Sequence, residues 1–231
     1  MRNVIKNFYL SFPFREPVVR LLGLSVMCVG LLAFRMYHSG SIRFMFLSWN
    51  LFLAWVPLGI ALLTYRRLEQ GRLRGCHGLA GWAGWLLFFP NAPYIITDLL
   101  HLTRRSAVPI WYDSLMVFSY ALVGLLAGLL SLYLIHRVMD RLLGRGAARL
   151  VVTGSLLLAG FGVYLGRFER WNSWDLLTDP SGLLGNALVQ LTNPTALRLT
   201  AVFALMLTLI YYTFVGFLQP PSGHVAAKHS S

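Results

Sequence analysis

The chain is dominated by long apolar stretches that are separated by short polar connections. An α-helix needs roughly 20 mostly apolar residues to cross the hydrocarbon core of a bilayer. Six stretches reach that length, at residues 17–37, 44–65, 77–97, 114–136, 148–168 and 196–218. The alternating pattern of a transmembrane β-strand is absent from the sequence. We therefore predict an all-α, polytopic membrane protein with a bundle of about six transmembrane helices.

The remaining residues form short tails around this one membrane domain. We expect the six-helix domain at residues 17–218, after a cytoplasmic or interfacial N-terminal segment at residues 1–16 that mixes aromatic and basic side chains. Residues 219–231 begin with Pro-Pro-Ser-Gly and continue with small and polar residues, so we expect a disordered cytoplasmic tail. The two cysteines are too few for a disulfide scaffold.

Arginine residues indicate which ends of the helices face the cytoplasm. The connections around residues 66–74 and 137–149 carry four arginines each, whereas each connection on the opposite side carries two. Because Lys and Arg are concentrated in cytoplasmic loops, the richer side is assigned to the cytoplasm. Both termini are then cytoplasmic.

Composition excludes several classes of protein. Hydrophobic residues make up 57% of the chain and charged residues 12%, whereas charged residues are about 25% of an average soluble domain. An ordinary soluble enzyme, a disordered chain and a coiled coil are therefore excluded. The net charge of +12 comes from arginines in short loops at helix ends. We read it as a topology signal and expect membrane lipids, not nucleic acid, as partners of these loops.

The third apolar stretch is interrupted by prolines and polar residues. Pro90 and Pro93 each remove a backbone donor and clash with the preceding turn, so a helix should break there. In lipid, the freed backbone groups need substitute partners or a wet cavity. Polar residues around and after the break recur at helical spacing and form one stripe, which contains Asn91, Tyr94, Asp98, His101 and Arg105.

Other segments are expected to bring polar side chains to the same depth, near the extracytoplasmic surface. Asn50 lies near the outer end of the second stretch, and Asp113 precedes the fourth. Arg167 and Arg170 are three residues apart at the outer end of the fifth stretch and so share a face. Polar groups at membrane depth are functional candidates. The candidate substrate-binding residues are Asn50, Asn91, Tyr94, Asp113, Arg167, Arg170 and Asn172, and the candidate catalytic residues are Asp98 and His101.

The chemistry of this cluster has several interpretations. An ion pair of Asp98 with Arg167 or Arg170 would order the outer loops, and His101 oriented by Asp98 would be a general base. Asp98 and His101 would hold a metal ion if a further carboxylate joined them, but we expect no metal and no other cofactor. A P-loop, an HExxH motif and a dinucleotide fingerprint are all absent from the sequence. The arginines would grip an anionic group or lipid headgroups.

The outer connection at residues 167–195 is long for a compact bundle. Asp179 followed by Pro180 is typical of a helix start. The leucines that follow would give this short helix an apolar face that lies on the membrane or caps the polar cluster.

Three segments carry a family resemblance. They are Trp-Asn-x4-Trp-x-Pro at residues 49–57, Phe-Pro-Asn-Ala-Pro-Tyr-x2-Thr-Asp-x2-His-Leu at residues 89–102, and Gly-Arg-Phe-x-Arg-Trp-Asn-Ser-Trp at residues 166–174. Together they resemble the DUF1361 family of bacterial integral membrane proteins. The resemblance implies a multi-pass protein of the bacterial cytoplasmic membrane, and it supplies no substrate and no catalytic assignment.

Two functional hypotheses from different classes follow. In the first, the protein is a membrane-embedded enzyme that acts on a lipid-linked or amphipathic substrate with an anionic group, which Arg167 and Arg170 hold while Asp98 and His101 move a proton. In the second, it is a non-catalytic membrane partner or assembly factor, and the cluster orders a docking surface. We favour the enzyme. A transporter is less favoured, because no charged path continues toward the cytoplasmic half of the helices.

Overall fold

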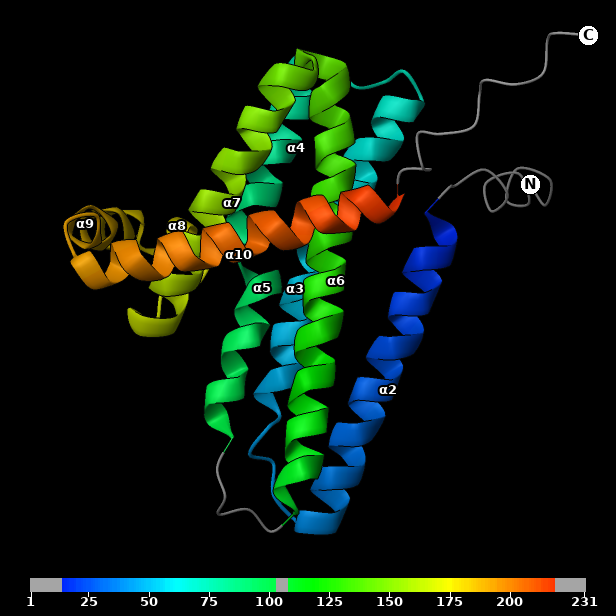
Figure 1. Ribbon diagram of the computed structural model, residues 1–231, viewed down its shortest axis with the longest axis vertical. Helices are drawn as coiled ribbons and strands as arrows, with labels where there is room; N and C mark the ends of the chain where they lie inside the picture. The colour runs from blue at the N-terminus through cyan, green and yellow to red at the C-terminus, as the bar shows by residue number, and fades with distance from the viewer. Residues whose placement is uncertain (1–13, 103–107, 219–231) are drawn as a thin grey trace, which may run out of the picture.

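The chain is helical over the residues that the structure, a computed structural model, describes: 14–102 and 108–218 (Figure 1). In chain order its elements are α2 (Arg15–Ser39), α3 (Phe46–Glu69), α4 (Gly75–Phe88), α5 (Asn91–Tyr94), the 3-10 helix η1 (Ile95–His101), α6 (Ile110–Leu143), α7 (Arg145–Phe168), α8 (Asp175–Thr178), α9 (Pro180–Gln190) and α10 (Pro194–Leu218). The all-α prediction is confirmed. Most of the predicted N-terminal segment, the predicted tail 219–231, and Arg104 and Arg105 lie outside the described residues.

Five of the helices in the described part of the chain are long and apolar enough to cross a membrane: α2, α3, α6, α7 and α10. The predicted span at residues 77–97 is instead divided among α4, α5 and η1, because the two prolines interrupt it. The protein is therefore a multi-pass, all-α membrane protein. Its division into six spans stays a prediction.

Helix α6 is the centre of the bundle. Two thirds of its most apolar segment is buried inside the protein, whereas 22% of the corresponding segment of α2 and 17% of that of α10 is buried. Its main neighbour is α3, and fully buried side chains such as Leu58, Met116 and Leu132 fill the space around their contact. A buried hydrogen bond from Nε1 of Trp85 to Oγ of Ser131, 3.0 Å long, joins α4 to α6. This arrangement leaves α2 and α10 exposed at the periphery, as lipid-facing helices require.

Small residues of α6 and α7 hold the broken segment from two sides. A Cβ atom added at Gly128 would lie 2.8 Å from the Cβ atom of Ala92, and one added at Gly162 would lie 2.7 Å from Cγ of Pro90. Such distances are too short for any residue other than glycine, so the helices approach closely here. The glycines that face this segment are Gly124, Gly128, Gly162 and Gly166.

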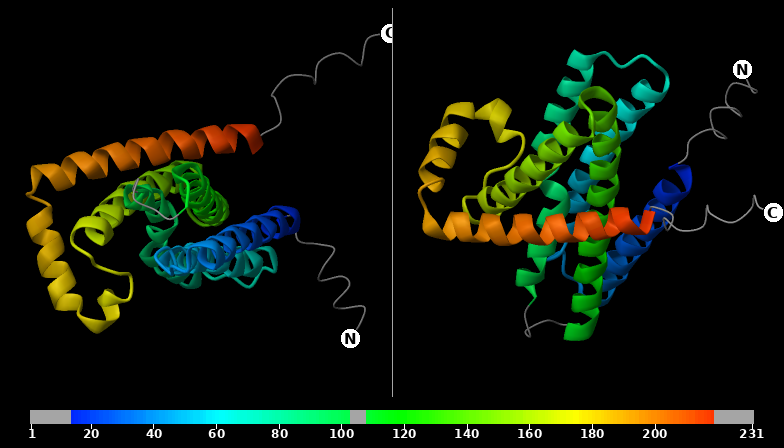
Figure 2. Two further views of the ribbon diagram at one scale, coloured as in Figure 1. Left: turned by 90° about the horizontal axis from the view of Figure 1, so that it is seen from below. Right: turned by 45° about the horizontal axis from the view of Figure 1, so that its top comes forward.

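Helix α10 lies across the long axis of the bundle (Figure 1), and two further views agree (Figure 2). It crosses α7 at Gly160, where an added Cβ atom would lie 2.8 Å from the backbone oxygen of Thr200. A hydrogen bond of 2.7 Å between Nδ1 of His136 and the hydroxyl of Tyr211 attaches it to α6. Gly160 thus permits the close approach to α7, and the hydrogen bond adds a polar contact with α6.

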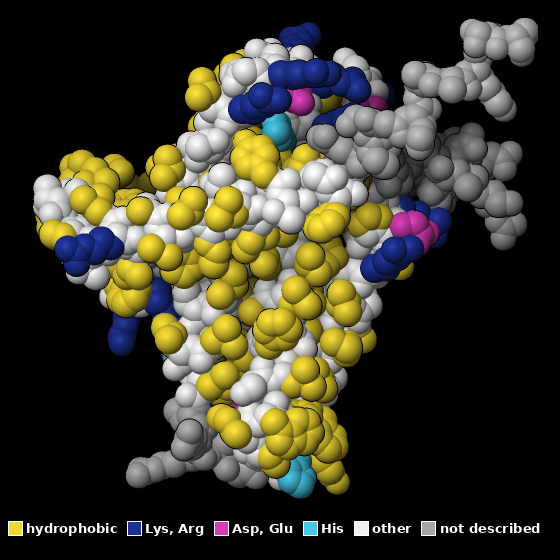
Figure 3. All heavy atoms as spheres, viewed as in Figure 1, with side chains coloured by type: hydrophobic (Ala, Val, Ile, Leu, Met, Phe, Trp, Pro, Cys, Tyr) yellow, Lys and Arg dark blue, Asp and Glu magenta, His cyan; other side chains and the backbone are white. Residues whose placement is uncertain are grey.

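Basic side chains gather at one end of the bundle. The α3–α4 and α6–α7 connections lie together at that end (Figure 1), where arginine side chains cover the surface (Figure 3). This is the clustering that the positive-inside argument uses. The cytoplasmic orientation of that end stays a prediction.

Candidate functional site

The break in the third apolar stretch is stabilised by side chains that replace the missing backbone donors. Helix α4 ends at Phe88, and the amide nitrogen of Asn91 donates to the backbone oxygen of Phe88 at 2.9 Å. The hydroxyl of Ser173, from the loop after α7, donates to the backbone oxygen of Leu87 at 2.8 Å. The same hydroxyl accepts a 2.9 Å hydrogen bond from Asn91. The predicted requirement for substitute partners is therefore met by two side chains that are far apart in the sequence.

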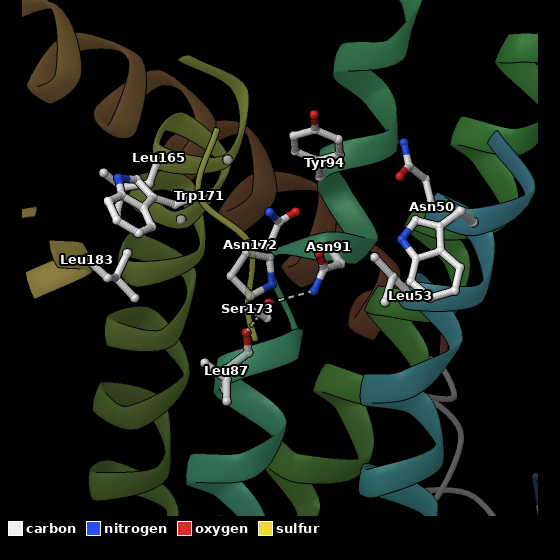
Figure 4. Close-up of a pocket in the computed structure, with 14 residues that line it drawn as sticks. Asn50, Leu53, Leu87, Asn91, Tyr94, Leu165, Trp171, Asn172, Ser173 and Leu183 are labelled. Carbon is white, nitrogen blue, oxygen red and sulfur yellow. Dashed lines mark hydrogen bonds between the residues drawn. The ribbon is translucent and has the colours of Figure 1, made fainter. Parts of the chain in front are cut away.

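A cavity of about 190 Å³ lies beside this break, between α3, α5, α7 and the loop at residues 171–173 (Figure 4). Polar and aromatic side chains line it, together with leucines and the glycines of α7. The larger lining side chains are Trp49, Asn50, Leu53, Leu87, Asn91, Tyr94, Leu165, Trp171, Asn172, Ser173 and Leu183. Since Leu183 belongs to α9, one residue of the predicted capping face reaches the cavity, whereas Leu184 and Leu188 are exposed.

A charged network shares one residue with the cavity. The amide nitrogen of Asn50 donates to Oδ2 of Asp98 at 2.8 Å, and Nη1 of Arg167 lies 3.6 Å from Oδ1 of Asp98. The Asp98 side chain is only 1% exposed and that of Arg167 is 14% exposed. A buried carboxylate without an opposite charge would be strongly destabilising, so this pairing is required where it lies. The predicted ion pair is therefore formed by Arg167 and not by Arg170.

His101 extends the network to the surface. Its Nε2 atom lies 3.0 Å from Nη1 of Arg167, so it accepts the hydrogen bond and the neutral ring carries its proton on Nδ1. Arg43 donates to the backbone oxygen of His101 at 3.4 Å, and the ring of Phe46 packs edge-on against the imidazole. His101 follows the end of the predicted third span. Partial burial and the charges of Arg167 and Arg43 lower the pKa of this imidazole, which favours its neutral, proton-accepting form.

The structure brings together most, but not all, of the predicted site residues. Asn50, Asn91, Tyr94 and Asn172 line the cavity, and Asp98, His101 and Arg167 form the network beside it. Arg170 is exposed and has a φ of 62° where the chain leaves α7, and it does not line the cavity.

Asp113 belongs to a different interaction. Its Oδ1 atom accepts a 3.0 Å hydrogen bond from Nε of Arg35, and both side chains are 2% exposed. Nη1 of Arg35 also donates to the hydroxyl of Ser39 and to the backbone oxygen of Ser41. Asp113 therefore joins α6 to the end of α2, and it is not among the residues that line the cavity.

Sequence reasoning missed two kinds of residue in this site. Ser173 was not expected to take part, yet its hydroxyl ties the outer loop to the end of α4. Trp49 and Trp171 are not among the candidate site residues of the sequence analysis, and both line the cavity. All three residues lie inside the motifs that carry the family resemblance. Their place in these motifs was therefore a signal that could have identified them, whereas residue type and helical spacing alone did not.

The described residues contain no group of three His, Cys, Asp or Glu side chains that is close enough to hold a metal ion. The metal interpretation therefore has no complete ligand set there.

Two carboxylates make hydrogen bonds within the outer loop. Asn172 is held by Asp175, whose Oδ2 atom accepts from the Asn172 backbone nitrogen at 2.6 Å. Glu169 accepts a 3.0 Å hydrogen bond from Asn186 of α9. These carboxylates thus order the outer loop.

A bundle of apolar helices with a polar site at a proline break defines a polytopic all-α membrane protein. Within that class, the family model described as a protein of unknown function, DUF1361, matches residues 49–212. The chain belongs to this family, as the three motifs indicate. No curated protein and no solved structure matches the chain.

Proposed function

We propose that this protein is an enzyme of the bacterial cytoplasmic membrane that acts on a lipid-linked or amphipathic substrate with an anionic group. The observation that carries the proposal is the network of Asp98, Arg167 and His101 next to a cavity. Perturbed, partly buried ionisable groups beside a cavity are typical of functional sites. The proposed opening of the site is toward the extracytoplasmic side, opposite the basic end of the bundle.

Arg167 is the proposed anion-binding residue. Its Nη1 atom contacts both Asp98 and His101, while Nε and Nη2 have no hydrogen bond to any residue in the described ranges. Those two atoms form one edge of the guanidinium fork, which suits two oxygens of a phosphate or carboxylate. Arg43 donates to the backbone oxygen of His101 and adds positive charge near the network.

His101 is the proposed proton acceptor, with Asp98 as the balancing charge. In the free protein, Nε2 of His101 is occupied by the hydrogen bond from Arg167. When an anion binds the Nε–Nη2 edge and the guanidinium moves toward it, Nη1 leaves Nε2 of His101, which then accepts a proton from a hydroxyl or amine of the substrate. The carboxylate of Asp98, three residues earlier, stabilises the resulting imidazolium and arginine charges.

Turnover of lipids by the purified protein tests the proposal. The full chain in nanodiscs made from a bacterial polar lipid extract is expected to convert one lipid species, followed by liquid chromatography and mass spectrometry. Because general acid–base catalysis contributes about 10²–10⁴-fold, Asp98→Asn and His101→Ala should slow conversion by at least roughly 100-fold. Glu16→Gln, an exposed position near the start of α2, is the matched control. If both site variants convert the lipid as fast as the unchanged protein does, the proposal is contradicted.

One observation favours the alternative function, a non-catalytic partner protein. Asn91 and Ser173 fasten the outer loop to the end of α4, and Glu169 fastens α9 to the end of α7. A loop held this firmly would also serve as a docking surface. In that case the unchanged protein and the site variants all fold normally, and none of them converts a lipid.

A further inference from the structure

The cavity and the charged network differ in chemistry although they share Asn50. None of the side chains that line the cavity from the described ranges is charged. Arg167, which follows the lining residue Gly166, contacts Asp98 and His101 instead. A ligand that filled both parts would therefore place an uncharged group in the cavity and an anionic group at Arg167.

The available acceptors in the cavity are side-chain amide oxygens. The amide nitrogen of Asn91 is committed to Phe88 and Ser173, which leaves its oxygen without a partner among the described residues. The amide nitrogens of Asn50 and Asn172 are directed at carboxylates, which likewise leaves their oxygens. The oxygens of an ionised phosphate only accept, so they cannot bond to these amide oxygens, whereas a hydroxyl group donates to them and also accepts from N–H donors.

Aromatic side chains supply the other half of the lining. Trp49, Trp171 and Tyr94 line the cavity. Trp49 packs edge-to-face against Trp174 with ring centroids 6.2 Å apart, which fixes its plane. The indole N–H groups of Trp49 and Trp171 donate to no residue in the described ranges. Aromatic rings with a polar tip combine an apolar surface with a hydrogen-bonding edge, and this suits the C–H faces and hydroxyl groups of a sugar ring.

The size and position of the cavity restrict the ligand further. Its volume of about 190 Å³ is below the roughly 300–1,000 Å³ of sites for drug-sized ligands. It therefore accommodates one small polar unit. Leu165 and Leu183 lie beside Trp171 on one side of the cavity (Figure 4), and they provide an apolar edge for a carrier chain. The amide groups of Asn91 and Asn172 lie together near its centre.

We infer that the cavity binds the uncharged sugar ring of a glycolipid. A cationic amine also suits aromatic rings and carbonyl oxygens, but no carboxylate lines the cavity within the described ranges and Arg167 lies next to it. The inference rests on the proposed function in one respect, since it places the sugar beside the anion site. The substrate class would then be a lipid-linked sugar phosphate, with the phosphate at Arg167 and the sugar in the cavity.

Native mass spectrometry of lipid retention tests the inference with the full-length protein. Phosphatidylcholine nanodiscs contain equal amounts of glucosyl-diacylglycerol, diacylglycerol and phosphatidylethanolamine. We expect retention of the glucosyl lipid at least about tenfold above that of diacylglycerol, since two or more hydrogen bonds are gained. Methyl glucoside added in solution distinguishes a free sugar from a lipid-borne one: displacement of the lipid by an equal concentration assigns a free sugar, and resistance to it assigns a glycolipid.

Variants separate the sugar site from the anion site. Asn172→Ala and Trp171→Leu should each reduce retention of the glucosyl lipid by about fivefold or more, whereas Trp111→Leu, at an exposed tryptophan of α6, should not. Arg167→Lys, which keeps the positive charge beside Asp98 but loses the guanidinium fork, should leave retention of this uncharged lipid unchanged, even if it slows lipid conversion. Equal retention of diacylglycerol, preferential retention of phosphatidylethanolamine, or insensitivity to both cavity variants would overturn the inference.

Discussion

At the scale of single residues, the protein separates its buried charges into two pairs with different roles. Arg167 and Asp98 lie beside the cavity, and Arg167 is 14% exposed, so an anion can reach it. Arg35 and Asp113 are both 2% exposed, and the aromatic ring of Phe44 lies 4.6 Å from the Arg35 guanidinium carbon. The second pair is therefore closed to ligands, and it fixes the end of α2 against α6.

The Arg35–Asp113 pair should contribute to stability and not to function. Asp113→Ala leaves Arg35 buried without this carboxylate, and loss of one partner of a buried pair costs about 3–5 kcal/mol. Thermal unfolding of the purified protein in detergent is expected to shift to clearly lower temperature, whereas Glu16→Gln at an exposed ion pair should change it little. An unchanged melting temperature in Asp113→Ala would show that the pair is not structural.

At the scale of the elements, the site depends on how closely α6 and α7 approach the broken segment. Gly162 permits contact with Pro90, and Gly128 permits contact with Ala92. The break itself positions the Asn91 side chain over the end of α4. Close packing thus sets the position of the polar residues, and the polar residues satisfy the backbone that the prolines left open.

Glycine-to-alanine substitutions on α7 test this packing with an internal control. Gly162→Ala would place a methyl group 2.7 Å from the rigid ring of Pro90, and overpacking of this kind costs about 1–3 kcal/mol. Gly154 lies on the same helix with nothing within 4 Å of an added Cβ atom, so Gly154→Ala should be neutral or stabilising by up to about 1 kcal/mol. Chemical or thermal unfolding compares the two. Equal stability of both variants would refute close packing at Gly162.

At the scale of the elements, the sequence predicts well those features that depend on neighbouring residues. The prolines predict the break, and Asp179 forms the predicted N-cap by accepting from the backbone nitrogen of Gly182. It predicts contacts between distant segments less well. Helical spacing does not show that Ser173 bonds to Leu87, or that Asp113 faces Arg35 and not the cavity, because both depend on how the helices are packed.

At the scale of the whole molecule, most long helices run along the bundle and one lies across it. Helices α2, α3 and α6 run beside one another, while α10 crosses the bundle against α7 (Figure 2). Hydropathy identifies α10 as apolar and long enough to cross a membrane. It does not show how α10 is oriented relative to the other helices. Contacts at Gly160 and Tyr211 accompany the crossing, and no periodicity of the sequence predicts them.

The central claim is that the polar cavity at the break opens to the extracytoplasmic side, opposite the basic end of the bundle. Labelling of intact cells with a membrane-impermeant maleimide tests it most directly, in a background that carries Cys28→Ser and Cys76→Ser. We predict that Asn172→Cys, which lines the cavity and is exposed, is labelled in intact cells. Arg72→Cys, in the exposed α3–α4 connection, should be labelled after lysis only. Labelling of Arg72→Cys in intact cells, with protection of Asn172→Cys, would contradict the account.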